Sequence, residues 1–347
     1  MTWSCPLAAR FVHARRPVPP FPAGRRAPAS QRCRSKRMTM TDKAITAASN
    51  VVRQALQDPA KRPAVKAFFD DDTNTVSYVV RDPNSRSAAI IDSVLDYDAA
   101  SGRTADSSAQ AVIDYIRDED LIVEWVLETH AHADHLSAAP LLKEQLGGRL
   151  AIGSDIQVVQ DVFGKTFNAG SDFARDGSQF DQLFNDGDAF KIGGLDALVI
   201  HTPGHTPACL AYVIGDAVFP GDTMFMPDAG TARCDFPGGD AATLYRSIRR
   251  LHQLPDEARV FVCHDYGTKD RPEIAWETTI GRERLENIHV REGVSEAEYV
   301  AVREARDATL AMPRLILPSI QVNMRAGHLP EPEADGRRYL KIPLDAL

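Results

Sequence analysis

The chain has 347 residues, of which 44% are apolar and 25% charged, ordinary values for a globular protein with a sizeable core. No apolar run reaches the ~20 residues that a membrane-spanning helix needs, so we expect no membrane partner. The formal net charge is −8, but residues 1–37 carry nine Lys/Arg and no Asp/Glu, which leaves −17 for the remainder. Such an acidic body argues against a nucleic-acid partner, because phosphate binding draws on Lys and Arg.

The first 37 residues differ in composition from the rest. They are rich in Pro and Arg, and we expect residues 1–40 to be a disordered or over-extended leader. An Arg-rich, acid-free segment is also typical of a transit peptide, although its prolines would break the amphipathic helix of such a peptide. We therefore expect a cytoplasmic protein, with a mitochondrial location as the alternative. Five cysteines without a C-x-x-C pair favour reduced thiols over disulfides.

The body of the chain alternates strand-like and helical segments. Apolar residues at helical spacing predict a first helix over residues 44–56. Short β-rich or apolar runs bounded by turn residues predict strands within residues 64–69, 75–83, 87–94, 121–130, 149–153, 197–203, 209–215, 217–222 and 259–267. Helical periodicity predicts helices within residues 107–120, 138–148 and 241–254. Strands followed by helices, twice over, predict two sheets with helices outside them.

Two further segments complete the predicted organisation. Residues 155–184 form a long polar excursion, and we leave open a lid, an oligomer contact or a plain surface insertion. Ser295 and Glu298 have the spacing of a capping box, which predicts a C-terminal helix. We expect a catalytic domain over residues 41–285, with a C-terminal helix and tail over residues 286–347 packed on it. Homo-oligomer formation through the excursion or the C-terminal helix is left open.

Histidine and aspartate side chains, which commonly bind metals, recur where the predicted strands end. Seven of them follow four strands: His130, His132, Asp134, His135, His205, Asp222 and His264. Side chains at the ends of different strands can converge on one point, and imidazole is the commonest metal ligand in proteins. A lone histidine is more often structural, but seven groups in one repeated arrangement predict a metal centre.

This pattern resembles the signature of the metallo-β-lactamase superfamily. The matching segments are His-Ala-His-Ala-Asp-His at residues 130–135, Gly204-His205, Gly221-Asp222 and His264. The resemblance covers about residues 64–267. It implies an α/β protein with an αββα sandwich and a C-terminal helical extension, with the metal site at one edge of the two sheets. It also implies an enzyme that acts on a small molecule.

The superfamily contains hydrolases and oxygenases, so its fold alone does not choose the reaction. In the hydrolytic arrangement all seven residues hold two zinc ions, with Asp222 bridging, and activated water attacks a thioester or amide. In the oxygenase arrangement, His130, His205 and Asp222 hold one Fe(II) per chain and leave positions for substrate and O₂. The other four residues then surround these ligands without binding the metal: His132, Asp134, His135 and His264.

Three smaller segments resemble the persulfide dioxygenase branch of this superfamily. They are ARCDF at 232–236, HDYG at 264–267 and NMRAG at 323–327. The resemblance implies an iron enzyme that oxidises glutathione persulfide with O₂ to sulfite and glutathione, and this is the expected function. A dizinc thioester hydrolase similar to glyoxalase II is the alternative, and a non-catalytic metal- or sulfide-responsive binding protein is a third hypothesis. Ala232, Cys234 and Ala326 depart from the branch pattern, which puts substrate details in doubt.

Two arginines in these segments are the expected substrate contacts. Glutathione carries two carboxylates, which favour bidentate guanidinium partners, and Arg233 and Arg325 are the candidates. A structural salt bridge is an equal alternative for each. Asp92, which ends a predicted strand, is either a carboxylate that orients a ligand or a turn residue. Cys209 and Cys234 are expected to be small buried residues.

Overall fold

The computed structural model describes residues 31–345, with side chains described from residue 43. By its contacts the chain divides into Met1–Met38 and Thr39–Leu347. Of the first unit, only the backbone of residues 31–38 is described, and it is helical. The predicted leader over residues 1–40 therefore lies largely outside the described residues. The features below belong to the second unit.

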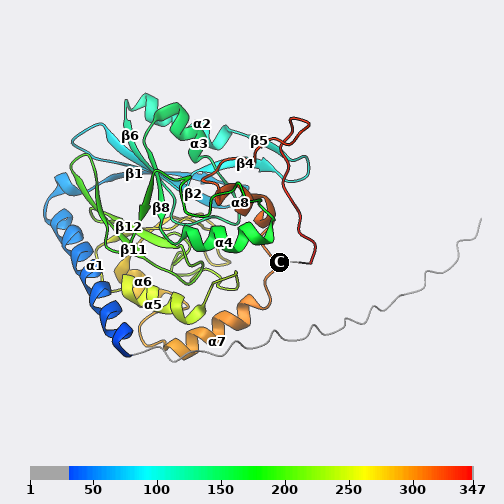
Figure 1. Cartoon of the computed structure of the whole chain (residues 1–347). Helices are drawn as coiled ribbons and strands as arrows, with labels where there is room; N and C mark the ends of the chain where they lie inside the picture. The colour runs from blue at the N-terminus through cyan, green and yellow to red at the C-terminus, as the bar shows by residue number, and fades with distance from the viewer. Residues whose placement is uncertain (1–30, 346–347) are drawn as a thin grey trace, which may run out of the picture. The chain divides into compact units, whose positions relative to one another are not determined.

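Two six-stranded sheets form the centre of this unit (Figure 1). The first sheet has the order β1 (Ala64–Asp70), β2 (Thr75–Arg81), β3 (Ser87–Ile91), β6 (Ile122–Leu127), β8 (Arg149–Gly153) and β9 (Gln182–Phe184). The second has the order β10 (Ala189–Ile192), β11 (Leu195–His201), β12 (Leu210–Ile214), β13 (Ala217–Phe219), β14 (Arg259–Phe261) and β15 (Glu277–Thr279). A small sheet joins β5 (Arg103–Ala105), β4 (Val94–Asp98) and β7 (Leu136–Ser137).

Parallel pairing appears where helices connect the strands. In the first sheet β3, β6, β8 and β9 pair in parallel, while β1, β2 and β3 pair antiparallel. In the second sheet only the β13–β14 pair is parallel, and α5 lies between these two strands in the chain. A parallel pair needs a long crossover, whereas a turn suffices for an antiparallel pair.

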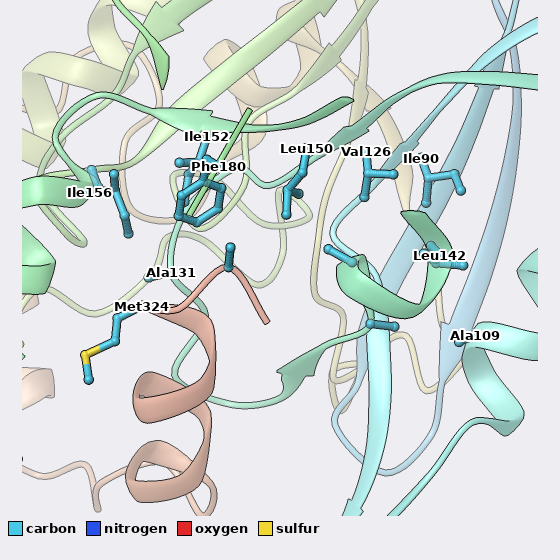
Figure 2. Packing of buried hydrophobic residues seen from close by; sticks show 14 of the residues in the cluster. Ile90, Ala109, Val126, Ala131, Leu142, Leu150, Ile152, Ile156, Phe180 and Met324 are labelled. Carbon is cyan, nitrogen blue, oxygen red and sulfur yellow. The ribbon is translucent and has the colours of Figure 1, made fainter. Parts of the chain in front are cut away.

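Helices cover the outer face of each sheet. The first sheet packs against α2 (Ser107–Asp118), α3 (Ala139–Leu146), α4 (Ile156–Thr166) and α8 (Ile316–Asn323). The second packs against the part of α1 (Gln31–Gln57) that contains Ile45, Ala48 and Val52, and against α5 (Ala241–Leu251), α6 (Ile280–Glu286) and α7 (Glu296–Asp307). Figure 2 shows part of the first of these layers, with sheet residues Ile90, Val126, Leu150 and Ile152 beside helix residues Ala109, Leu142 and Ile156.

A third apolar layer lies between the two sheets. Successive side chains of a strand point to opposite faces, so one strand serves two layers. In β2, Tyr78 and Val80 pack between the sheets, whereas Val79 packs against the helices. In β12, Tyr212 and Val213 divide in the same way. Both faces of each sheet are therefore buried, and the expected αββα sandwich is confirmed.

Only the middle of the segment from residue 155 to residue 184 is a polar surface excursion, in which residues 170–172, 174, 176 and 178 are exposed. The first part of the segment is α4, in which Val159 and Phe163 are buried in the layer outside the first sheet. Phe167 and Phe180 are buried in the same layer. These apolar residues follow a helical spacing within a largely polar segment, and they pack the segment onto the sheet.

The C-terminal part contains two helices instead of one. The Ser295 hydroxyl accepts from the Glu298 N–H, and the Glu298 carboxylate accepts from the Ser295 N–H, which confirms the capping box that opens α7. The next helix, α8, buries Ile316 and Ile320 over the first sheet. Within the described part of the chain, no helix is both long and apolar enough to cross a bilayer.

Candidate metal centre

The seven candidate metal ligands lie close together where four strands end, at one edge of both sheets. His130 follows β6, His205 lies in the loop between β11 and β12, and Asp222 and His264 follow β13 and β14. The segment from His132 to His135 lies in the loop before β7, and α3 begins only at residue 139. No helix begins at Asp134 or His135, because the two-residue strand β7 intervenes and pairs with β4.

His130, His205 and Asp222 form the first cluster. Their ligand atoms lie within 4.8 Å of one another, and all three side chains are largely buried. His205 Nδ1 donates to the main-chain carbonyl of Arg233 at 2.7 Å, which leaves Nε2 facing Asp222. Burial, followed by the neighbouring His132 and His205, lowers the pKa of His130 well below its ordinary value. His130 is therefore a neutral imidazole, the form that binds metals.

His132, Asp134 and His264 form the second cluster, also within 4.8 Å. The Asp134 carboxylate lies 3.4 Å from His264 Nε2 and 3.2 Å from His135 Nδ1. Burial alone would raise the pKa of Asp134, but His264 and His135 hold it well below its ordinary value. The carboxylate is therefore ionised beside these imidazoles.

The Asp222 carboxylate lies between the two clusters. Its Oδ2 is 3.4 Å from His205 Nε2, and its Oδ1 is 3.4 Å from His264 Nε2. Gly221 precedes it with φ +52°, and a Cβ at this glycine would lie 2.5 Å from Thr129 Oγ1. Glycine is thus required for β13 to end so close to the Thr129 segment. The two oxygens of one carboxylate face different clusters.

Four imidazole nitrogens at this edge are buried and have no hydrogen-bond partner among the described residues: His130 Nε2, His132 Nδ1, His135 Nε2 and His264 Nε2. Buried polar atoms without partners are costly and rare in native proteins. Metal ions would satisfy these lone pairs, and both clusters contribute orphaned nitrogens. The donor set therefore fits metal at both clusters.

His132 is oriented by a carboxylate behind it. Its Nε2 lies 3.0 Å from Asp92 Oδ1 and 3.3 Å from Glu128 Oε2. Although burial opposes it, Asp92 raises the pKa of His132 well above its ordinary value. Asp92 is itself fixed by the Thr129 N–H at 2.7 Å and the Thr129 hydroxyl at 2.8 Å. Of the two interpretations of Asp92, the structure supports the orienting carboxylate, and a metal that binds Nδ1 of His132 would displace the proton that the raised pKa holds there.

Asn323, near the C-terminal end of the chain, holds residues 132–137 (the histidine segment) in place. Its side-chain amide donates to the carbonyls of His132 and His135, both at 2.8 Å, and its carbonyl accepts from the Ser137 N–H at 2.9 Å. Asn323 lies in the NMRAG segment, which resembles the dioxygenase branch, but the sequence predicts no role for it. The feature of the sequence that could have indicated its role is a polar residue at the end of a largely apolar helix, and such a residue is weak evidence by itself.

The sequence predicts no role for Cys263 either. Its thiol donates to Asp222 Oδ1 at 2.7 Å. Burial, followed by the charge of Asp222, raises the pKa of Cys263 well above its ordinary value, so the thiol keeps its proton and remains a donor. Cys209 and Cys234 are buried, as expected for small core residues.

A cavity of about 480 Å³ opens onto both clusters. Asp134, His205, Asp222 and His264 form its metal-facing wall. Apolar side chains form much of the remainder: Phe225, Ala229, Phe236, Ile288, Leu310 and Pro313. No residue of the 155–184 segment lines it, so the structure gives no support to a lid formed by that segment.

The two arginines predicted to bind substrate lie in different places. Arg233 lines the cavity, but its guanidinium forms a bidentate pair with Asp235, with both N–O distances 2.6 Å, and lies over the Phe236 ring. Arg325 lies outside this cavity, over the Phe173 ring at 4.5 Å. The structure therefore does not bring the two arginines together at the metal-facing cavity.

Comparison with known proteins identifies relatives. The family model of the metallo-beta-lactamase superfamily matches residues 70–264. A probable metallo-hydrolase of Burkholderia pseudomallei is 57% identical over 293 residues, covering 82% of this chain and 99% of that protein. Glyoxylase B2 of Dictyostelium discoideum is 47% identical, covering 83% of this chain and 99% of that protein. A beta-lactamase hydrolase-like protein of Agrobacterium fabrum is 52% identical, covering 82% of this chain and 65% of that protein.

The resemblance to persulfide dioxygenases is confirmed at greater distance. The crystal structure of ETHE1 from Myxococcus xanthus matches with a TM-score of 0.61 and 29% identity, covering 76% of this chain and all of that one. The mitochondrial persulfide dioxygenase ETHE1 of Bos taurus is likewise 29% identical, covering 76% of this chain and 88% of that protein.

The expected persulfide dioxygenase activity is contradicted by these findings. Relatives with 47–57% identity are named as hydrolases or a glyoxylase, whereas the dioxygenase is only 29% identical. The three segments that resemble the dioxygenase branch contain residues that hold the site in position. The Arg233 carbonyl accepts from His205, Asp265 pairs with Arg271, and Asn323 fastens the histidine segment. Contacts that hold ligands in position are needed for either reaction, so these segments do not favour oxidation over hydrolysis.

Proposed function

Because the chain belongs to the metallo-beta-lactamase superfamily, we propose that it is a hydrolase with a two-metal centre that cleaves thioesters, similar to glyoxalase II. The observation that carries the proposal is the Asp222 carboxylate, whose two oxygens face the two clusters at 3.4 Å each. A single metal at the first cluster would leave the orphaned nitrogens of His135 and His264 without a partner. The names of the more similar relatives point to hydrolysis as well.

Each metal would have three ligands of its own and would share Asp222. The first would be held by His130 Nε2 and His205 Nε2 together with His132 Nδ1, because the His132 ring lies 4.1 Å from that of His130 as well as beside the second cluster. The second would be held by Asp134, His264 and His135, whose Nδ1 lies 3.2 Å from Asp134. A pair of divalent ions supplies Lewis acidity and activates water at neutral pH for attack on an acyl carbon. Zinc is the metal that we propose, because nitrogen and carboxylate donors suit it and hydrolysis needs no redox change.

The surrounding residues hold the ligands in place. Asp92 fixes the ring of His132, and the Cys263 thiol donates a hydrogen bond to the shared carboxylate of Asp222. The rings of Phe236 and Phe225 pack edge-on against His205 and His264, with centroids 5.2 and 6.1 Å apart. This apolar wall excludes water beside the metal-facing groups, which strengthens their electrostatic effect on a developing charge.

The test is metal analysis together with turnover. Protein purified without added metal should contain about two zinc ions per chain and should hydrolyse S-lactoylglutathione, followed by the loss of thioester absorbance. The proposal is overturned if the protein holds one iron per chain, leaves the thioester intact, and consumes O₂ with glutathione persulfide.

Variants separate the two clusters. His264→Ala should reduce the metal content by about half, because it removes a ligand of the second cluster alone. Asp222→Ala should remove both metals and all turnover. His328→Ala is the matched control, because His328 is exposed and lies outside both clusters. Full metal content in His264→Ala would show that the second cluster is not a ligand set.

A further inference from the structure

We propose that a second cavity, separate from the metal centre, binds a small molecule with one carboxylate on an apolar body, and that Arg325 holds the carboxylate. This inference goes beyond the proposed hydrolysis and does not depend on it. The second cavity has a volume of about 560 Å³, within the usual range for small-molecule sites. It shares no lining residue with the metal-facing cavity.

Side-chain hydrogen bonds hold the walls of the second cavity in place. In the C-terminal segment, the Gln321 amide donates to the Lys341 carbonyl at 2.9 Å and accepts from the Lys341 N–H at 2.8 Å. In α4, the buried Gln160 donates to Gln179 Oε1 at 2.8 Å and to the Met324 carbonyl at 2.9 Å. The segments that line the cavity are therefore fixed to α8 and α4, so the cavity is formed before any ligand binds.

Arg325 is a half-buried cation without an anionic partner. Its guanidinium lies over the Phe173 ring at 4.5 Å and donates to the Gln321 carbonyl at 2.6 Å, but it forms no ion pair within the described part of the chain. Burial lowers the pKa of Arg325, and no nearby carboxylate opposes that effect. A buried charge is costly unless it is paired, and a guanidinium has five N–H donors. Most of these donors are left for a ligand.

The other charges around the second cavity limit the ligand to a single negative charge. Asp172, Glu331 and Glu333 line the cavity at exposed positions. Against these three carboxylates, Arg325 and Lys341 are the lysine and arginine side chains of the lining. A phosphate monoester, with nearly two negative charges at neutral pH, is repelled by such a rim. One carboxylate at the more deeply placed Arg325 is favoured instead.

The body of the ligand is inferred from the apolar part of the lining. Phe167, Phe173, Leu329 and Pro330 contribute to it, and the Tyr339 ring lines the same cavity although it is 44% exposed. Apolar and aromatic side chains around a few polar groups are typical of small-molecule sites, where the polar groups fix the orientation. A guanidinium binds a carboxylate with two parallel hydrogen bonds. The chemistry that fits is a monocarboxylate with an apolar or aromatic body.

The experiment compares three probes that share a phenyl ring: phenylacetate, the neutral phenylacetamide and the more highly charged phenyl phosphate. Their Kd values for the metal-loaded protein are measured by ligand-observed NMR titration. Because carboxylates and phosphates also bind metal ions, the binding assigned to the second cavity is the part that Arg325→Gln removes. Arg325→Gln should weaken phenylacetate binding by about tenfold or more, from the loss of a charge-assisted hydrogen bond, and should leave phenylacetamide unchanged. Arg325→Lys should recover part of the loss, because the charge remains but the planar fork does not.

Arg314→Gln is the matched control, because Arg314 is an exposed arginine that lines neither cavity. The inference is overturned if phenylacetate shows no saturable binding to the wild-type protein, or binds equally well to Arg325→Gln. An equal loss of phenylacetate and phenylacetamide in Arg325→Gln would also overturn it, because Arg325 would then only support the cavity wall. If Arg325 contributes as much to the binding of phenyl phosphate as to that of phenylacetate, the restriction to one negative charge is wrong.

Discussion

Asn323 offers a direct test of how the C-terminal part supports the metal centre. Its side chain is 4% exposed and forms three hydrogen bonds with the histidine segment. Asn323→Ala leaves two carbonyls and one N–H unpaired in a buried place. At about 1 kcal/mol per unpaired group, the low end of the usual range, the free energy of unfolding should fall by about 3 kcal/mol. Because the carbonyls belong to His132 and His135, the ligands should also lose their fixed orientation.

We therefore expect the metal affinity of Asn323→Ala to fall by roughly 10- to 100-fold, the usual effect of removing a group that orients ligands. Asn323→Asp keeps the shape and the acceptor for Ser137, but it turns an oxygen toward the carbonyls of His132 and His135. It should be at least as damaging as alanine at neutral pH. Metal affinity is measured by competition with a chromophoric chelator, and stability by urea unfolding.

Gln321→Ala is the control on the same helix. Its side chain bonds to Leu317 and Lys341 and has no hydrogen bond to the histidine segment, so stability should fall while metal affinity stays the same. Wild-type metal affinity in Asn323→Asp would refute the proposed role of Asn323. An equal loss of affinity in Gln321→Ala would show that α8 acts only through global stability.

Three further predictions concern separate features. Asp92→Ala removes the acceptor for His132 Nε2, so metal affinity should fall roughly 10- to 100-fold in the chelator assay; an unchanged affinity would argue against the orienting role. Burial raises the pKa of Glu283 to about 8, so the folded state holds this proton more tightly than the unfolded state, and stability should fall by a few kcal/mol as pH rises from about 5 to 9. Glu283→Gln should flatten that dependence in urea unfolding, whereas Glu286→Gln, at an exposed site on the same helix, should not. Phe163→Ala should cost roughly 3–5 kcal/mol of stability with the metal content unchanged in the folded protein; a loss of metal there would mean that α4 supports the centre directly.

Local features of the chain were sufficient to predict the two-sheet architecture and the residues that gather at the candidate metal centre. Alternation in β2 and β12 and the helical spacing of α2 and α5 depend on neighbouring residues, so they can be seen in the sequence. The ligands could be predicted because each follows a strand, and strand ends meet at one edge of a sheet. Residues 155–184 were misinterpreted because their polar composition concealed the spacing of Val159 and Phe163.

The reaction could not be obtained in this way, because the same seven residues occur in both arrangements, as three ligands and four surrounding residues in a one-metal oxygenase and as seven ligands in a two-metal hydrolase. What tertiary structure decided is how distant groups meet. It placed the two oxygens of Asp222 toward different clusters, brought Asn323 to the histidine segment, and paired Arg233 with Asp235. Such pairings depend on the packing of whole layers, and residue order along the chain does not encode them locally.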